Sequence, residues 1–152
     1  MMRSHVPEAR AGNERGQALL ETALVLPVVL LISVGIFEFG RAYQLVQVLT
    51  NAAREGARIA VMYGTNEADI RARVTAYLDA GQVPANGGMT IDVNQSATIV
   101  VGTGTASASV VTVNYPYTFM VLNPVANLVV HGTTTGGPIT LSASAEMRNE
   151  AE

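Results

Sequence analysis

An apolar run near the N-terminus constrains this chain more than any other feature of its sequence. Residues 22–37 are sixteen consecutive positions without a charge, and Glu21 and Glu38 bracket them. At ~1.5 Å per residue a helix over residues 17–39 is about 34 Å long, against ~30 Å for the hydrocarbon core of a bilayer. The run is therefore long enough to cross a membrane if both carboxylates lie near the interfaces.

Two other interpretations of this run have to be weighed. A buried helix of a soluble protein would need partners on all sides, and no other segment is apolar enough to supply them. A secretory signal peptide would need a shorter apolar region and a small-residue cleavage site, which residues 38–46 (EFGRAYQLV) do not offer. The sequence therefore predicts a retained transmembrane helix over residues 17–40.

The orientation of this helix follows from its flanks. Arg3, Arg10 and Arg15 precede it, and cationic residues favour the cytoplasmic side, although Arg41 on the far side reduces the asymmetry. All the polar, β-rich sequence follows the single span. We therefore predict a cytoplasmic N-terminus and an extracytoplasmic domain from about residue 41 to residue 152.

An acidic residue opens the apolar run, where an ionised carboxylate at membrane depth costs roughly 2.5–3.5 kcal/mol. Glu21 either marks the interfacial end of the span or has a function there. It stands fifth after Gly16, directly before an apolar run that contains Pro27. Proline removes a backbone hydrogen bond and bends a helix, which bundled membrane helices tolerate.

The glycine and glutamate spacing resembles the prepilin processing site of type IV-type pilins. The wider sequence is similar to the TadE-like pseudopilins of tight-adherence (Flp-type) pilus systems. The matching features are Gly16 with Glu21, the Leu-Pro step at Pro27, the exit EFGR at residues 38–41, and AAREGAR at residues 52–58. The resemblance is close over residues 16–61 and extends to the rest of the chain only in pattern.

This resemblance implies a function and a set of partners. A peptidase of the inner membrane would remove residues 1–16 by cutting between Gly16 and Gln17. Glu21 would then pair with the freed α-amine of a neighbouring subunit in the fibre, which offsets the cost of burying its charge. The implied partners are the inner membrane, the prepilin peptidase, other pilins and the pilus assembly machinery, and the implied role is initiation or priming of assembly.

Beyond the membrane segment, apolar and small residues continue at helical spacing and predict a helix over about residues 41–63. Ala52, Gly56 and Ala60 form a ridge of small side chains, which lets another element approach closely. The ridge seats the helix either on the sheet of its own domain or against neighbouring subunits. Arg54 and Arg58 are interpreted as a solvated face.

The remaining sequence predicts a short helix and a small antiparallel sheet. Asn66 as N-cap and Gly81 as stop delimit a helix over residues 67–80, whose inner face would hold Ile70, Val74, Tyr77 and Leu78. Residues 89–148 are β-rich, with three β segments: 89–93 with 98–101, then 109–117, then 139–147. The last alternates cleanly between apolar and polar residues. A helical crossover is predicted over residues 123–130, before a loop at 131–138. The predicted fold is α+β and pilin-like.

Residues that carry chemistry are scarce. Cys and Lys are absent, and a net charge of -3 argues against a nucleic-acid partner. His5 lies in the predicted leader and His131 stands alone, so we expect no metal, no cofactor and no catalytic site. The GTGT at residues 102–105 is interpreted as a hairpin turn rather than a phosphate cradle. Two function classes remain: a processed minor pilin, or an uncleaved single-span anchor that carries a small extracytoplasmic binding domain.

Overall fold

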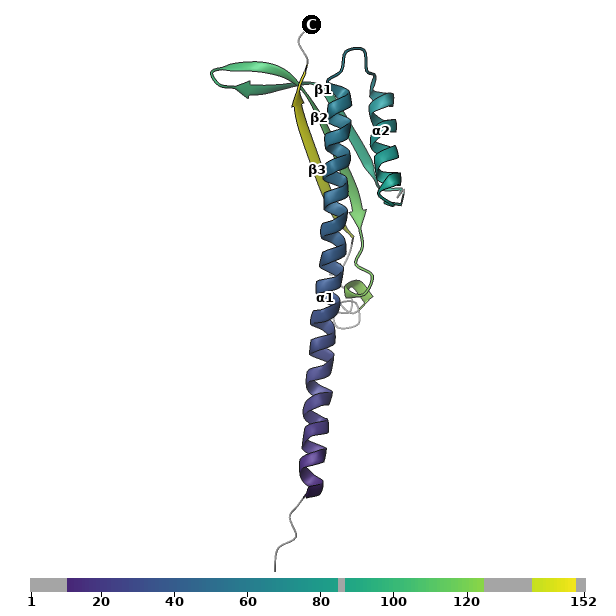
Figure 1. Ribbon diagram of the computed structural model, residues 1–152, viewed down its shortest axis with the longest axis vertical. Coiled ribbons are helices and arrows are strands. Elements are labelled where there is room, and N and C mark those ends of the chain that lie inside the picture. Colours follow the sequence, from purple (N-terminus) through teal and green to yellow (C-terminus); the bar gives the residue numbers. More distant parts are fainter. Residues whose placement is uncertain (1–10, 85–86, 125–137, 150–152) are drawn as a thin grey trace, which may run out of the picture. The chain divides into compact units, whose positions relative to one another are not determined.

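The computed structural model describes residues 11–84, 87–124 and 138–149 (Figure 1), and these divide into two compact units between Phe37 and Glu38. Helix α1, Ala11–Ala60, contributes its first part to one unit and its last part to the other. The fold class is α+β: a long apolar N-terminal helix is followed by a small antiparallel sheet.

The first unit is the apolar part of α1. Its large side chains are exposed, including Leu24 at 68%. Among the described residues, α1 is the one helix long and apolar enough to cross a membrane. The hydroxyls of Thr22 and Ser33 donate to the carbonyls of Ala18 and Val29, each at 2.8 Å. These polar groups are therefore satisfied within the helix, as an apolar surrounding requires.

The second unit contains a three-stranded antiparallel sheet in the order β1-β2-β3. The strands are β1, Thr90–Val101, β2, Gly104–Tyr117, and β3, Ile139–Arg148. β1 is one continuous strand that joins the two parts of the first predicted β segment, 89–93 and 98–101, with an irregularity between Asn94 and Ala97. A turn with Gly102 at φ +62° joins β1 to β2, which confirms the predicted hairpin.

Two helices and the sheet form the hydrophobic core of this unit. The last part of α1 and helix α2, Glu67–Ala80, lie beside each other with the strands behind them (Figure 1). The core takes its buried side chains from both helices and from one face of the sheet: Leu49, Ala52, Ala53, Ala57, Ile70, Val74, Leu78, Val111, Val113, Tyr115 and Ala143. Tyr77 was expected among them, but it is 37% exposed.

The other face of the sheet is polar. Thr112 and Ser144 hydroxyls lie 2.9 Å apart, and Ser142 donates to the Asn114 side-chain oxygen at 2.7 Å. These pairs join β2 to β3 on the solvent side. One face buried and one face wet is the arrangement that the alternation in residues 139–147 predicts.

The ends of both helices are fixed by identifiable groups. α1 ends at Ala60, before the predicted end at residue 63, and the Ala60 carbonyl accepts hydrogen bonds from Gln95 at 3.2 Å and Ser109 at 3.3 Å. Asn66 is confirmed as the N-cap of α2, since its side-chain oxygen accepts from the Asp69 N–H at 2.9 Å. α2 stops before Gly81 as predicted.

Glycine is required at position 81 for space rather than for backbone conformation. Its φ of -77° is ordinary, and the left-handed conformation falls on the next residue, Gln82, at φ +56°. A Cβ at Gly81 would lie 2.6 Å from Cγ1 of Val48 on α1. The end of α2 can therefore approach α1 closely only without a side chain at this position.

Candidate functional site

The residues singled out for processing lie on the exposed surface of α1. Among the described residues, a Cβ added at Gly16 would meet no atom within 4 Å beyond its own helical backbone. Glu21 is exposed on the same helix. The Gly16–Gln17 bond lies inside α1, which begins at Ala11, whereas the sequence placed the helix after that bond. A peptidase that cuts an extended backbone would therefore have to unwind this first part of the helix.

Pro27 lies within α1, and the helix continues on both sides of it. Its neighbours Leu26 and Val28 are about half exposed, at 51% and 56%. The apolar surface around the proline is therefore available to lipid or to other helices.

The small residues of α1 are buried inside the second unit. Ala52 is fully buried, Ala60 is 4% exposed, and Gly56 is buried between them. A Cβ at Gly56 would lie 2.5 Å from Cγ2 of Val74 on α2 and 3.1 Å from Cγ1 of Val111 on β2. Within this unit the ridge therefore brings α1 against both α2 and the sheet.

An ion-pair cluster joins α1 to α2 on the outside of the unit. Glu55 Oε1 lies 2.8 Å from Arg58 Nη2 and 2.7 Å from Arg73 Nη2. Hydrogen bonds from Arg58 and then Arg73 lower the pKa of Glu55 from its ordinary 4.5 to about 2, while burial acts in the opposite direction. The sequence placed Arg58 on a solvated face; its side chain is exposed and pairs with Glu55 within α1. The partner across the helices, Arg73, gave no local signal.

Residues that directly follow the apolar run on α1 form a second cluster with the end of β2. Glu38 is only 6% exposed, and its side-chain carboxyl group accepts a hydrogen bond from the Met120 backbone N–H at 2.8 Å. The Tyr117 hydroxyl donates to the Glu38 carbonyl at 3.3 Å. The Arg41 guanidinium lies 5.3 Å from the Tyr117 ring centroid and contacts the Met120 sulfur. Two residues of the EFGR sequence on α1, Glu38 and Arg41, therefore hold the end of β2 and the segment after it against this helix.

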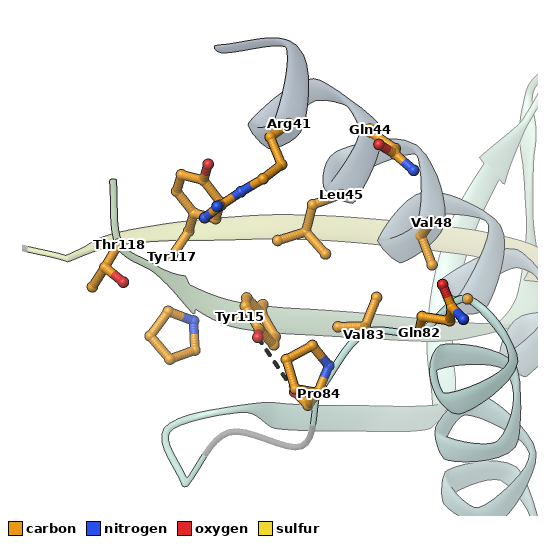
Figure 2. Close-up of a pocket in the computed structure, with 12 residues that line it drawn as sticks. Arg41, Gln44, Leu45, Val48, Gln82, Val83, Pro84, Tyr115, Tyr117 and Thr118 are labelled. Carbon is orange, nitrogen blue, oxygen red and sulfur yellow. Dashed lines mark hydrogen bonds between the residues drawn. The ribbon is translucent and has the colours of Figure 1, made fainter. Parts of the chain in front are cut away.

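A cavity of about 500 Å³ lies next to this cluster (Figure 2). Residues 41–48 of α1, the segment 81–84 after α2 and the end of β2 line it. Figure 2 shows Leu45 and Val83 turned toward the same space, and Tyr115 donates to the Pro84 carbonyl at 3.3 Å. The lining is mixed: Leu45, Val48 and Val83 are apolar, and Arg41, Gln44, Gln82 and Thr118 carry polar groups.

Metal-binding clusters are absent from the part of the chain that the structure describes: no group of three or more His, Asp or Glu side chains is placed to hold an ion. His5 and His131 lie outside the described residues, as does most of the crossover predicted over residues 123–130. Its first two residues, 123 and 124, are described and belong to a helical turn over 122–124.

Residues 16–58 match the family model described as TadE-like protein. This match confirms the resemblance seen in the sequence, and it covers Gly16, Glu21, the apolar run and the first two residues of the buried ridge, Ala52 and Gly56. It ends before α2 and the sheet. Comparison with curated proteins found no match, and comparison with solved structures found none either.

Proposed function

We propose that this chain, whose residues 16–58 form a TadE-like segment, is a membrane-anchored minor pilin of a tight-adherence, Flp-type pilus. In this proposal it acts in the initiation or priming of pilus assembly after a prepilin peptidase has processed it. The match to the TadE-like family supports an association with such a pilus. The finer role rests on the arrangement of residues along α1.

One observation carries the proposal: a single helix combines three parts that a pilin subunit needs. Gly16 and Glu21 are exposed near its start, the apolar run follows, and its last turns are buried in a folded α+β unit. Processing, membrane anchoring and presentation of a domain would then all depend on one continuous element.

Glu21 has a specific role in this proposal. A carboxylate at the edge of the apolar run is poorly placed for an isolated membrane helix, because burying an unpaired charge is costly. Cleavage after Gly16 would create an α-amine at Gln17, and the Glu21 of one subunit would pair with that amine of its neighbour. The charge is then neutralised only in the assembled fibre.

The proposed location is the inner membrane, with residues 1–15 in the cytoplasm and the domain from about residue 41 outside. The apolar part of α1 supports a single-pass anchor. The Arg residues ahead of it favour this orientation by the positive-inside rule.

The deciding experiment is the intact mass of the protein from cells with and without the prepilin peptidase. Cleavage after Gly16 leaves 136 residues beginning with Gln17. We expect this species only when the peptidase is present. An unprocessed chain in both strains would contradict the proposal and would favour the uncleaved anchor with a small binding domain.

A matched pair of variants makes the experiment sharper. Gly16→Ala adds a methyl group in open space and favours the helix by up to about 1 kcal/mol, which opposes unwinding at the scissile bond. Gly35→Ala makes the same change farther along α1, where a Cβ also meets no described atom within 4 Å. We expect Gly16→Ala to slow cleavage and Gly35→Ala to leave it unchanged.

A further inference from the structure

Aromatic and apolar side chains gather where the end of β2 meets α1, and much of their surface is uncovered. The Phe39 and Phe119 rings pack edge to face at 5.7 Å, and Phe119 and Tyr117 do so at 5.2 Å. Phe39 is nevertheless 63% exposed, Met120 66% and Val121 43%. We refer to Phe39, Phe119, Met120 and Val121 as the aromatic patch.

The patch is held at a fixed level on α1. The hydrogen bond from the Met120 N–H to the Glu38 carboxylate and the bond from the Tyr117 hydroxyl to the Glu38 carbonyl both end on one residue of the helix. Glu38 directly follows Phe37, the last residue of the uncharged run. The segment after β2 therefore lies beside the turn of α1 that leaves the apolar run.

Helix geometry gives the depth of this turn. At ~1.5 Å per residue, Phe39 lies about 3 Å beyond Phe37 along the helix axis. The polar layer on each side of a bilayer is about 5–7 Å thick, from a total of ~40–45 Å and a hydrocarbon core of ~30 Å. If α1 spans the membrane as proposed, the patch falls within that layer.

The chemistry of the patch suits the same layer. Residues 117–123 carry no charge, and the acid that contacts them, Glu38, is buried and hydrogen-bonded. Aromatic rings concentrate at membrane interfaces, where one side of the ring is apolar and the other is wet. Arg41 is exposed at the same level over the Tyr117 ring, where a guanidinium can meet lipid phosphates.

We propose that the aromatic patch is a membrane-surface site, by which the segment after β2 inserts into the interfacial layer of the bilayer that α1 crosses. The inference rests on the proposed membrane anchor and adds a second point of attachment. Two attachments, α1 and the patch, would hold the domain in one orientation on the membrane surface. The Glu38 carboxylate acts here as a positioning group for the patch.

Tryptophan fluorescence can test this directly, because the chain has no Trp. The full chain is reconstituted in vesicles of phosphatidylethanolamine and phosphatidylglycerol with one Trp at a time. Val121→Trp reports on the patch, Leu30→Trp on the apolar part of α1, and Val100→Trp, at an 80% exposed position beside the β1–β2 turn, on the far end of the hairpin. Quenchers are lipids with a nitroxide at the headgroup or with bromines deep in the acyl chain.

We expect the headgroup nitroxide to remove most of the emission of Val121→Trp, the deep bromines to quench Leu30→Trp, and neither to quench Val100→Trp. Equal thermal unfolding by circular dichroism shows that the variants fold. Adding Glu38→Ala to Val121→Trp should reduce the headgroup quenching, because the positioning bond is lost.

Each other outcome counts against the inference in a distinguishable way. Quenching of Leu30→Trp without quenching of Val121→Trp overturns the membrane-surface site and leaves the proposed anchor intact. An unquenched Leu30→Trp overturns the anchor and the site together. Emission of Val121→Trp that shifts with the ratio of protein to lipid, but is not quenched by lipid, would show that a second copy covers the patch and would overturn the inference.

Discussion

Glu55 on α1 and Arg73 on α2 are joined by two hydrogen bonds from the guanidinium to Oε1, at 2.9 and 2.7 Å. The same carboxylate also receives two from Arg58, one turn along its own helix. Glu55 is thus the point at which α1 and α2 are linked by charge, on top of the apolar contact between them at Gly56 and Val74.

This link predicts an acid-dependent stability. The pKa of Glu55 in the folded state, about 2, lies below its ordinary value of 4.5, so the carboxylate form is the one that folding favours. Its contribution is complete above about pH 4.5 and is lost as the pH falls toward 2. Glu55→Gln should lower stability at neutral pH by roughly 1 kcal/mol, because its partners are exposed to solvent.

The measurement is the Tm of the full chain in detergent from neutral pH to pH 2, for wild type and Glu55→Gln. The difference in Tm between wild type and Glu55→Gln should become smaller below pH 4.5. Glu67→Gln is the control, since its pair with Arg71 lies within α2 alone and links no second element. A gap for Glu55→Gln that stays constant across this range would contradict the assigned pKa.

Gly56→Ala tests the close approach of α1 to its neighbours. The new methyl group would meet Val74 and Val111, at 2.5 and 3.1 Å, and the branched side chains there have little freedom to move away. Overpacking of a core typically costs ~1–3 kcal/mol, against a gain of about 1 kcal/mol in helix propensity. We expect a net loss of stability, and a larger one for Gly56→Val.

Gly40→Ala, on the same helix as Gly56, is the matched control. A Cβ at Gly40 would meet no described atom within 4 Å beyond its own helical backbone. It should leave the Tm unchanged or raise it slightly. Equal Tm values for Gly56→Ala and Gly40→Ala in thermal unfolding would contradict this prediction, because they would show that the core accommodates a methyl group at position 56.

Glu21→Gln separates assembly from folding. Gln is nearly the same size but cannot form the ion pair, and loss of one partner of a buried pair typically costs ~3–5 kcal/mol because the other charge stays uncompensated. The variant should insert in the membrane and fold its domain normally, yet fail to join or prime the pilus. Pilus counts and co-purification with other pilins, at matched protein levels, measure this. Wild-type piliation would favour a merely interfacial Glu21.

The proposed orientation makes a further prediction. Tyr63 is 87% exposed between α1 and α2, so a reporter fused after it begins clear of both helices. A reporter that works only outside the cytoplasm should be active there, and a reporter that works only inside should be silent. The reverse pattern would refute a cytoplasmic N-terminus.

Local patterns predicted much of this fold. The inner face of the last part of α1, the N-cap at Asn66, the turn at Gly102 and the alternation in β3 all depend on neighbours a few residues away. The predictions that differed involve competition from more distant groups. α1 ends at Ala60 rather than at residue 63, and Gln95 and Ser109, far along the chain, donate hydrogen bonds to the Ala60 carbonyl.

The candidate site divides in the same manner. The apolar run, the spacing of Gly16 and Glu21, and the small residues of α1 can be recognised without a structure, because composition and periodicity are properties of a short stretch of chain. The contacts of Glu38 with Met120, 82 residues away, and of Glu55 with Arg73 follow from the folded arrangement alone. Such pairs arise when packing of the core brings distant segments together, and no pattern along the chain encodes which charged or polar groups then meet.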